Sequence, residues 1–307
     1  MDLTNIKTIK KLCQEYGLHP NRSNGQNFLI DRNILEKIVA AGEIKKDDMI
    51  LEIGPGFGVL TQELVKYSGQ VVAVEKDRRL AEYLSEHKTK LIEHRNNLEI
   101  INKDILRFKI YDLGFKNFKI ISNLPYQITS PVLWKFLHYD HLSPVLPLVR
   151  GGGLESMVLM VQKEVGERIC AQKGQMSILS VLCQLYADCE IVAPVSRNCF
   201  WPVPEVDSVT VKLKIKDKEF INPPLSPSGL RPPLEKGGIM DIKEFMRLVK
   251  IGFSAKRKML KNNLAGGLQL PMDKVVLTLQ KAGLDEKIRA QELAIKDWIE
   301  LYSFFNN

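Results

Sequence analysis

The chain has 307 residues, of which 45% are hydrophobic and 26% are charged. This composition is typical of soluble globular proteins, and the length suffices for one large domain and a smaller one. No stretch approaches the ~20 apolar residues that a membrane-spanning helix needs. Residues 1–13 are rich in Lys and contain no apolar run. We therefore expect a cytoplasmic protein that does not enter a membrane.

The net charge is +8 and the isoelectric point is about 9.1. A basic protein suits a polyanionic partner such as nucleic acid, because each Lys or Arg placed against a phosphate releases counterions. Many basic proteins bind no nucleic acid, so charge alone does not decide the partner. The five cysteines include no Cys-x-x-Cys pair and no His at metal-ligand spacing, so we expect neither a metal site nor a disulfide framework. We also expect a monomer.

Strand and helix patterns alternate through most of the chain. A short apolar strand, Met49–Ile53, leads into a glycine-rich turn at residues 54–58 and then into helical spacing over Val59–Tyr67. A strand at Gln70–Val74 and a helix at Arg79–Glu86 repeat the pattern. Further strands fit Leu98–Ile101, Phe118–Ser122 and Met157–Gln162. The alternation predicts an α/β fold of the Rossmann-like type with a doubly wound, mainly parallel sheet.

The end of the chain differs in pattern from the rest. From residue 242 onward the spacing is wholly helical, with twelve Lys and Arg against seven Asp and Glu. Two segments rich in Pro and Gly, residues 142–153 and 223–238, cannot hold a helix or a central strand. We predict an α/β domain over residues 1–215 with a low-complexity insertion at 142–153. A linker over 216–241 then holds the second insertion, and a small basic all-helical domain follows over 242–307.

A candidate cofactor site lies at the end of the first strand. Gly54, Gly56 and Gly58 allow the backbone to turn sharply and to approach a ligand closely, where such sheets bind their ligands. A dinucleotide site would need glycine at position 59, which is Val, so the cofactor need not contain a pyrophosphate. Glu75 ends the next strand about 20 residues on, where a carboxylate can accept hydrogen bonds from two ribose hydroxyls. The plainer interpretation of Glu75 is an exposed strand-end carboxylate.

Asp104 follows the strand at Leu98–Ile101 and can accept a hydrogen bond from an adenine amino group. By residue type alone, a helix cap is the more ordinary role for an Asp at this place. Its position at the same edge of the sheet as Gly54 and Glu75 makes it a candidate for cofactor binding.

The most specific motif is Asn123-Leu124-Pro125-Tyr126, which directly follows the strand at Phe118–Ser122. The exocyclic amine of adenine is a poor nucleophile because its lone pair is delocalised into the ring. The Asn123 side-chain oxygen and a backbone carbonyl held by the turn at Pro125 can accept its two N–H bonds, favouring the pyramidal geometry that attack needs. Tyr126 can stack on an extruded base. The plainer interpretation is an ordinary exit from strand to turn.

Phe200 begins an aromatic stretch held by prolines, residues 200–208, which is a candidate for the other wall of a base pocket. An aromatic side chain beside prolines is usually a packing residue. A stacking role for Phe200 is favoured because an extruded base has two faces to cover and Tyr126 covers only one.

In order along nearly the whole chain, these motifs resemble the ribosomal RNA adenine dimethylase family. Residues 25–29 resemble its amino-terminal motif, in which the positions of Asn27 and Leu29 contact S-adenosylmethionine. Residues 160–165 and 200–208 resemble two later motifs. The resemblance implies a class I methyltransferase fold in which Asn123, Pro125, Tyr126 and Phe200 are catalytic. It also implies S-adenosylmethionine as cofactor, bound by Asn27, Leu29, Glu52, Gly54, Gly56, Glu75, Asp104 and Asn123.

Within the family, residues 253–264 are similar to a basic helix in the carboxy-terminal module of the KsgA/RsmA branch. This likeness implies dimethylation of two adjacent adenines near the 3′ end of small-subunit (16S) ribosomal RNA during assembly of the 30S subunit. The RNA would be bound through Lys256, Arg257, Lys258 and Lys261. Lys173 stands where the family tends to have Tyr, and the two insertions are atypical; these departures concern surface recognition rather than chemistry.

Two other functions stay open on the sequence. An Erm-type enzyme would share the active-site chemistry but methylate one adenine of large-subunit 23S ribosomal RNA; the basic carboxy-terminal helices argue against it. A non-catalytic RNA-binding or assembly factor could retain the fold without the reaction. The intact Asn123, Tyr126 and Phe200 argue against that alternative.

Overall fold

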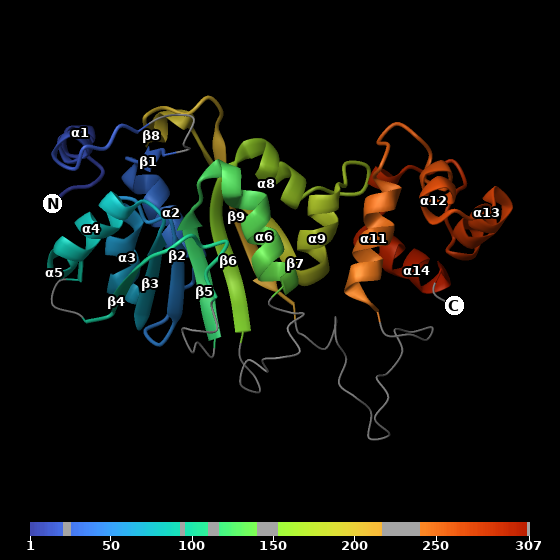
Figure 1. Cartoon of the computed structure of the whole chain (residues 1–307), viewed down its shortest axis with the longest axis horizontal. Coiled ribbons are helices and arrows are strands. Elements are labelled where there is room, and N and C mark those ends of the chain that lie inside the picture. The colour runs from blue at the N-terminus through green and yellow to red at the C-terminus, as the bar shows by residue number, and fades with distance from the viewer. Residues whose placement is uncertain (21–25, 93–95, 110–116, 140–152, 217–239, 306–307) are drawn as a thin grey trace, which may run out of the picture. The chain divides into compact units, whose positions relative to one another are not determined.

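The structure is a computed structural model that describes residues 1–20, 26–92, 96–109, 117–139, 153–216 and 240–305 (Figure 1). The insertion predicted at 142–153 lies outside these residues except for its last residue, Gly153, which begins a strand. The insertion predicted at 223–238 and most of the predicted linker also lie outside them.

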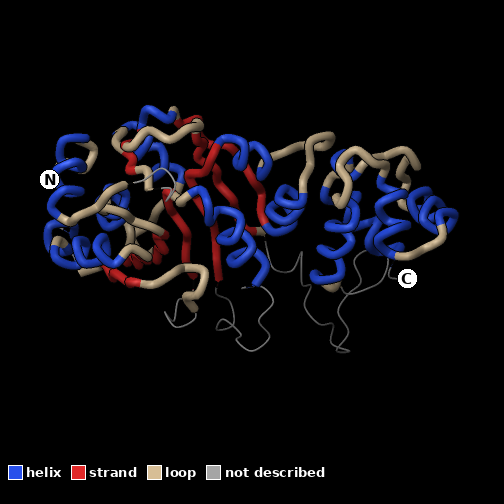
Figure 2. Tube along the Cα trace, turned by 45° about the horizontal axis from the view of Figure 1, so that its top comes forward, coloured by secondary structure: helices blue, strands red, loops and turns tan. Residues whose placement is uncertain are grey.

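A seven-stranded sheet lies at the centre of the fold, flanked by helices (Figures 1 and 2). Neighbouring strands from β4 to β6 are parallel, and β9 pairs antiparallel with β6. This confirms the predicted α/β fold with a mainly parallel sheet. The strands lie in the order β4 (Leu98–Asn102), β3 (Gln70–Glu75), β2 (Met49–Ile53), β5 (Asn117–Asn123), β6 (Gly153–Gln162), β9 (Ser208–Ile215) and β7 (Ala187–Val195).

The helices around the sheet follow the predicted alternation. The helix after the glycine turn, α3 (Val59–Tyr67), has an apolar face: Leu60 and Leu64 lie one turn apart, and both are buried. A separate two-stranded sheet joins β1 (Phe28–Leu29) to β8 (Phe200–Trp201). The helices are α1 (Ile6–Glu15), α2 (Arg32–Ala41), α3 (Val59–Tyr67), α4 (Arg78–Glu86), α5 (Lys88–Ile92) and α6 (Thr129–Trp134), which continues as a π-helix over Lys135–Tyr139.

The order of the strands reverses between β2 and β5, and the pairing there is short. Only Ile50 and Leu51 of β2 are in register with β5, although both strands continue toward their carboxyl ends. Beyond these pairs, the buried Ser122 hydroxyl donates a hydrogen bond to the Ile53 carbonyl. A side chain thus joins the two strands at the point of reversal, which is where open α/β sheets bind ligands.

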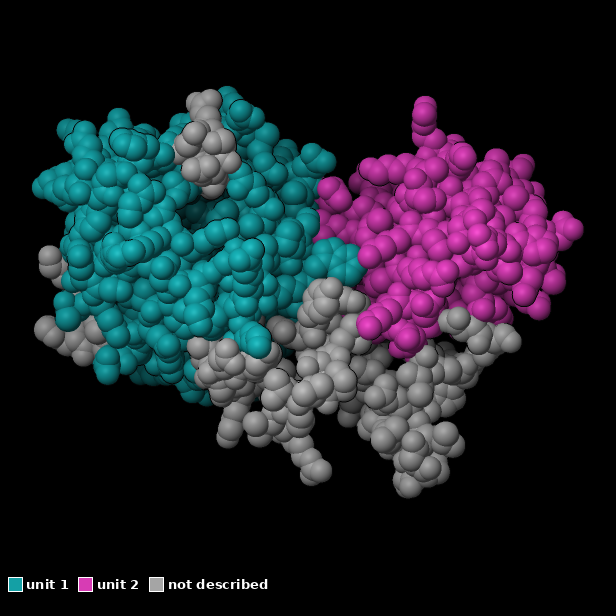
Figure 3. Space-filling view, viewed as in Figure 1, with its two compact units in different colours: residues 1–166, 189–215 teal, residues 167–188, 216–307 magenta. Residues whose placement is uncertain are grey.

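The chain divides into two compact units (Figure 3). The first comprises residues 1–166 and 189–215, and the second comprises 167–188 and 216–307. Residues 167–188, predicted within the α/β domain, therefore group with the carboxy-terminal helices. The segment contains α9 (Ile178–Tyr186), which contacts α11 (Ile242–Gly252) and α14 (Ile295–Phe305). Seven of its nine residues are buried, so α9 needs neighbours on nearly every side.

Helices make up the second unit, as predicted for the end of the chain. Besides α9, α11 and α14, it contains α12 (Leu260–Leu268), α13 (Met272–Lys281) and the end of α8 (Lys163–Ile169). Trp298 on α14 is fully buried, and its ring fills the space beside Gly252. Residues 253–259, predicted as part of a basic helix, instead form the turn between α11 and α12.

A buried ion pair ties β5 to the segment that leads into β2. Lys119 on β5 is 7% exposed. Its Nζ lies 2.7 Å from Asp48 Oδ2 and donates to the carbonyl oxygens of Glu43 at 2.8 Å and Gly42 at 3.3 Å. One lysine therefore binds three oxygen atoms of the segment that precedes β2, at the end of the sheet opposite the glycine turn.

We expect Lys119→Met to lower the free energy of unfolding by about 3 kcal/mol, because it leaves the Asp48 carboxylate, whose side chain is only 11% exposed, without its counter-charge. Chemical denaturation at neutral pH measures the change. Lys212→Met is the matched control. Lys212 on β9 has a side chain that is 13% exposed, and it pairs at 2.6 Å with Glu43, whose side chain is 76% exposed. Its replacement leaves a carboxylate that water can solvate, so we expect a change of about 0–1 kcal/mol. Equal losses in the two variants would contradict the assignment.

Candidate active site

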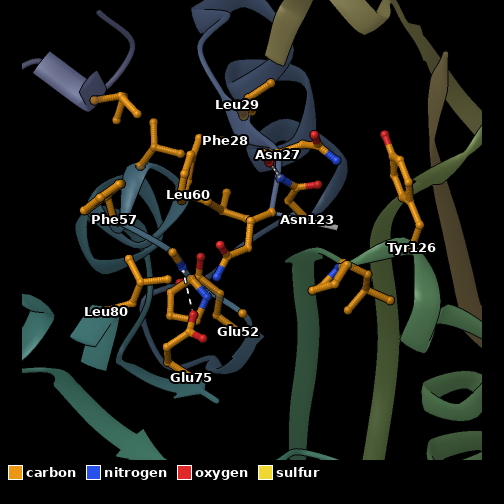
Figure 4. A pocket seen from close by; sticks show the side chains of 18 residues that line it. Asn27, Phe28, Leu29, Glu52, Phe57, Leu60, Glu75, Leu80, Asn123 and Tyr126 are labelled. Atoms are coloured by element: carbon orange, nitrogen blue, oxygen red, sulfur yellow. Dashed lines mark hydrogen bonds between the residues drawn. The ribbon is translucent and has the colours of Figure 1, made fainter. Parts of the chain in front are cut away.

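A pocket lies at the carboxyl ends of β2, β3 and β5 (Figure 4). It is lined by residues 26–29, 54–57 and 123–126 and by side chains from neighbouring strands and helices. Ile9 of α1 is among them, although no sequence motif pointed to it. The structure brings together nearly all of the predicted cofactor and catalytic residues: Asn27, Leu29, Glu52, Gly54, Gly56, Glu75, Asn123, Pro125 and Tyr126.

The glycine turn has the backbone geometry that the sequence predicted. Gly54 and Gly56 have φ angles of +67° and +60°, in the left-handed region that glycine favours. A Cβ atom at Gly54 would lie 3.4 Å from Cδ of Pro125, so the glycine turn and the turn after β5 pack closely. The Gly56 N–H donates to Oε2 of Glu75 at 3.2 Å. The two turns and the end of β3 therefore form one connected site.

Two carboxyl groups are buried at one end of the pocket. Glu75 is 7% exposed and also accepts the Asp77 N–H at 2.8 Å; burial raises the pKa of its carboxyl. Glu52 is 1% exposed and accepts a hydrogen bond from the Thr61 hydroxyl at 2.7 Å. Burial raises the pKa of Glu52 to about 8, and the neighbouring Glu75 adds to the effect. Glu75 is not the exposed carboxylate of the plainer interpretation.

Asn123 ends β5 with its side chain held in one orientation. Its Nδ2 donates to the backbone carbonyl of Asn27, with 3.4 Å between nitrogen and oxygen. This assigns the amide nitrogen to the protein and leaves Oδ1 as an acceptor. The Leu124 N–H donates to the Met160 carbonyl at 3.3 Å and holds the turn against β6. Figure 4 shows Asn123 between Glu75 at one end of the pocket and Tyr126 at the other.

Asp104 does not line this pocket. Its carboxylate pairs with Lys76 at 2.9 Å, and its Oδ1 accepts the Leu106 N–H at 3.0 Å. The hydrogen bond from Lys76 lowers the pKa of Asp104. In this structure Asp104 thus stabilises the turn that follows β4, which is close to its plainer interpretation as a cap.

Phe200 also lies away from the pocket lining. Its side chain is 1% exposed and belongs to the hydrophobic core. Residue 200 is in register with Leu29 in the β1–β8 ladder, so its backbone is fixed beside the amino-terminal motif. In this structure Phe200 packs in the same core cluster as Phe28 and Leu29, and its stacking on a base stays a prediction.

Residues 17–225 match the family described as Ribosomal RNA adenine dimethylase. The chain belongs to this family. Ribosomal RNA small subunit methyltransferase A of Dehalococcoides mccartyi is 36% identical over 95% of this chain and 90% of its own length. The crystal structure of a dimethyladenosine transferase from Plasmodium falciparum is similar with a TM-score of 0.70 and 29% identity, over 91% of this chain and 97% of the other.

A solved 23S rRNA methyltransferase, ErmE, is similar with a TM-score of 0.65 and 25% identity, over 92% of this chain and all of the other. It is thus less similar in sequence and in fold than the dimethyladenosine transferase. Among the described residues no group of three or more His, Cys, Asp or Glu is placed to hold a metal ion. In the same part of the chain, no helix combines the length and apolarity needed to cross a membrane.

The predicted RNA-binding residues of this family member lie in the second unit and differ in their surroundings. Lys256, Arg257 and Lys258 are exposed in the turn between α11 and α12. Lys261 lies in the first turn of α12; its side chain is 20% exposed and its Nζ lies 3.5 Å from Oε2 of Glu286. The turn is therefore open to a polyanion, whereas Lys261 has an acidic partner within the protein.

The raised pKa of Glu52 predicts how its variant responds to pH. The unfolded chain releases this proton near the ordinary pKa of 4.5, whereas the folded protein holds it to about pH 8. Folding is therefore penalised progressively between these values and fully above them. Glu52→Gln removes the penalty while retaining an acceptor for Thr61.

We expect Glu52→Gln to raise the melting temperature of the cofactor-free protein clearly at about pH 9 and little at about pH 5. Thermal denaturation at both pH values tests this. Glu82→Gln, at an exposed site on α4, is the control for general effects of losing a carboxylate. A stabilisation of Glu52→Gln that is the same at both pH values would contradict the assignment.

Proposed function

We propose that the protein is an S-adenosylmethionine-dependent methyltransferase that dimethylates N6 of two adjacent adenines near the 3′ end of small-subunit (16S) ribosomal RNA. We place the reaction in the cytoplasm, on the assembling 30S subunit. The observation that carries the proposal is the packing of the Asn123–Tyr126 turn against the glycine turn, with Gly54 beside Pro125. A cofactor site and an amine-binding turn thus share one pocket.

The pocket residues fit S-adenosylmethionine. Glu75 presents a buried carboxylate suited to two ribose hydroxyls, and Phe57, Leu60 and Leu80 supply apolar walls for an adenine ring. Oδ1 of Asn27 is buried and has no hydrogen-bond partner within the described chain, as expected for an acceptor that awaits a ligand. Asp104 would join this site only if its ion pair with Lys76 opened.

The cofactor supplies a methyl group that is already activated on a sulfonium, so the chain's own residues need only position the amine and stabilise its charge. Asn123 Oδ1 accepts one amine N–H, because Nδ2 is occupied by the Asn27 carbonyl. A backbone carbonyl of the turn at Pro125 accepts the other. As the amine becomes positively charged during attack, these dipoles stabilise it increasingly. Tyr126 supplies a face for the extruded base.

Sequence identity over nearly the whole chain favours small-subunit ribosomal RNA over large-subunit ribosomal RNA as the substrate. The relative that is 36% identical over 95% of this chain is named for the small subunit, whereas the large-subunit enzyme ErmE is 25% identical. The basic turn at residues 256–258 supports the same substrate, because it offers three exposed positive charges to phosphates.

Asn123→Ala is expected to lower kcat by about 10²–10³-fold, because it removes an acceptor that acts on the reacting amine. The assay follows transfer of labelled methyl groups to small and large ribosomal subunits that lack the modification, at saturating S-adenosylmethionine. The wild type should form dimethyladenosine only in small-subunit RNA.

Asn117→Ala is the matched control, since Asn117 lies at the other end of the same strand and should leave turnover near the wild-type value. Methylation of large subunits by the wild type would favour the Erm-type alternative. No methylation of either subunit would favour the non-catalytic one. An Asn123→Ala protein with most of the wild-type kcat would remove Asn123 from the mechanism.

The basic turn generates a separate prediction. Replacing Lys256, Arg257 and Lys258 together by Gln should weaken RNA binding and flatten the slope of log affinity against log salt by about 2–3 units, because each lost phosphate contact removes about one unit. Lys261→Gln is the comparison variant and should change the slope by less, since Glu286 already neutralises that charge. Unchanged slopes in the triple variant would make the turn a merely solvated surface.

A further inference from the structure

A hydroxyl from another strand contacts the proposed base-stacking residue. Oγ of Ser208, the first residue of β9, lies 2.7 Å from the hydroxyl oxygen of Tyr126, 82 positions away in sequence. Ser208 is 1% exposed and is in register with Gln162 of β6. The contact therefore joins the turn after β5 to β9, the strand that runs antiparallel to β6.

The position of Ser208 is fixed by its neighbours as well as by the ladder. The carbonyl of Asp207 accepts the Lys163 N–H at 3.0 Å, and Oδ1 of Asp207 accepts the Arg197 N–H at 2.9 Å. Residue 207 is thus tied to α8 on one side and to the loop before β8 on the other. These bonds restrain the backbone next to Ser208, so the position of the Ser208 hydroxyl is well defined.

Tyr126 needs such a partner. The side chain is only partly buried and projects from a short turn, so packing alone leaves its ring angle weakly defined. A phenol hydroxyl removed from water usually finds a hydrogen-bond partner. With its hydroxyl anchored at Ser208, the ring keeps its place at the end of the pocket opposite Glu75 (Figure 4). An aromatic surface that is fixed before the substrate arrives costs less to order on binding.

We propose that Ser208 is a positioning residue for the reaction: its hydroxyl holds the Tyr126 ring in the orientation that receives the target adenine. This inference rests on the proposed role of Tyr126 as the stacking residue. Ser208 is not among the residues that line the pocket, whereas Tyr126 is, so the effect that we assign to Ser208 passes through Tyr126. Loss of the hydroxyl should leave the cofactor site intact and reduce the fraction of bound RNA whose base is correctly held.

The strand itself provides a matched control. Thr210 lies two residues further along β9, on the same face as Ser208, and is fully buried. Its Oγ1 has no hydrogen-bond partner within the residues that the structure describes. Thr210→Val removes this hydroxyl at nearly constant volume. It therefore reports what the loss of a buried hydroxyl from β9 does when no bond to Tyr126 is involved.

The experiment measures single-turnover methyl transfer to small ribosomal subunits that lack the modification, with saturating RNA and S-adenosylmethionine. Ser208→Ala and Tyr126→Phe should each lower the rate by about 3- to 10-fold, the effect of losing one ordinary hydrogen bond. The double variant should be no slower than the slower single variant, because both substitutions remove the same bond. Thr210→Val should keep the parent rate. Calorimetric affinity for S-adenosylmethionine and the melting temperature should stay near the parent values in all four.

A parental rate in Ser208→Ala, multiplied effects in the double variant, or an equal loss in Thr210→Val would each overturn the inference. If Ser208→Ala failed to fold, Tyr126→Phe alone would decide, because it removes the bond and keeps the ring; full activity would then reject the role. Tyr126→Ala separates this inference from the proposed function. Its full activity would reject stacking by Tyr126, whereas its inactivity beside a fully active Ser208→Ala would reject only the positioning role.

Discussion

The structure depends on how β2 and β5 are held together where the strand order reverses. Ladder pairing covers only Ile50 and Leu51 of β2, and the Ser122 hydroxyl then bridges to the Ile53 carbonyl. The strand ends stay close enough for the glycine turn and the Asn123 turn to pack on each other. The site therefore forms where the ladder between β2 and β5 ends, at a position that the topology dictates.

The electrostatics of the pocket follow from the same arrangement. Glu52 is the next-to-last residue of β2 and Glu75 is the last residue of the adjacent β3, so both carboxyl groups are buried at one end of the pocket, where burial raises both pKa values. Backbone N–H groups and the Thr61 hydroxyl offset part of this cost. Carboxyl groups whose pKa values are perturbed by burial and by a neighbouring charge cluster at functional sites. Burial of Glu52 and Glu75 thus lowers the stability of the fold at neutral pH, while it places two carboxyl groups where a ligand can bind.

Sequence patterns predicted the parts of the fold that depend on local order. The strand at Met49–Ile53 and the helix at Val59–Tyr67 have the predicted bounds, because apolar periodicity and the glycine turn mark their ends directly. What the patterns missed depends on contacts between distant segments. Phe200 is buried where β8 pairs with β1, and Lys261 of α12 meets Glu286 in the loop that follows α13. Neither partner is visible from the neighbouring residues. The Ser208 contact with Tyr126 is of the same kind.

The discontinuous second unit has a consequence for how this family can diversify. Residues 167–188 belong with the carboxy-terminal helices, and α9 supplies buried surface to α11 and α14. An exchange of the segment after residue 241 between two relatives would therefore break a shared hydrophobic core rather than swap a self-contained module. Recombination that preserves folding must carry both segments, or must change them in step. The two segments of the second unit must therefore stay compatible in sequence, because the buried face of α9 is covered by helices that come more than 50 residues later in the chain.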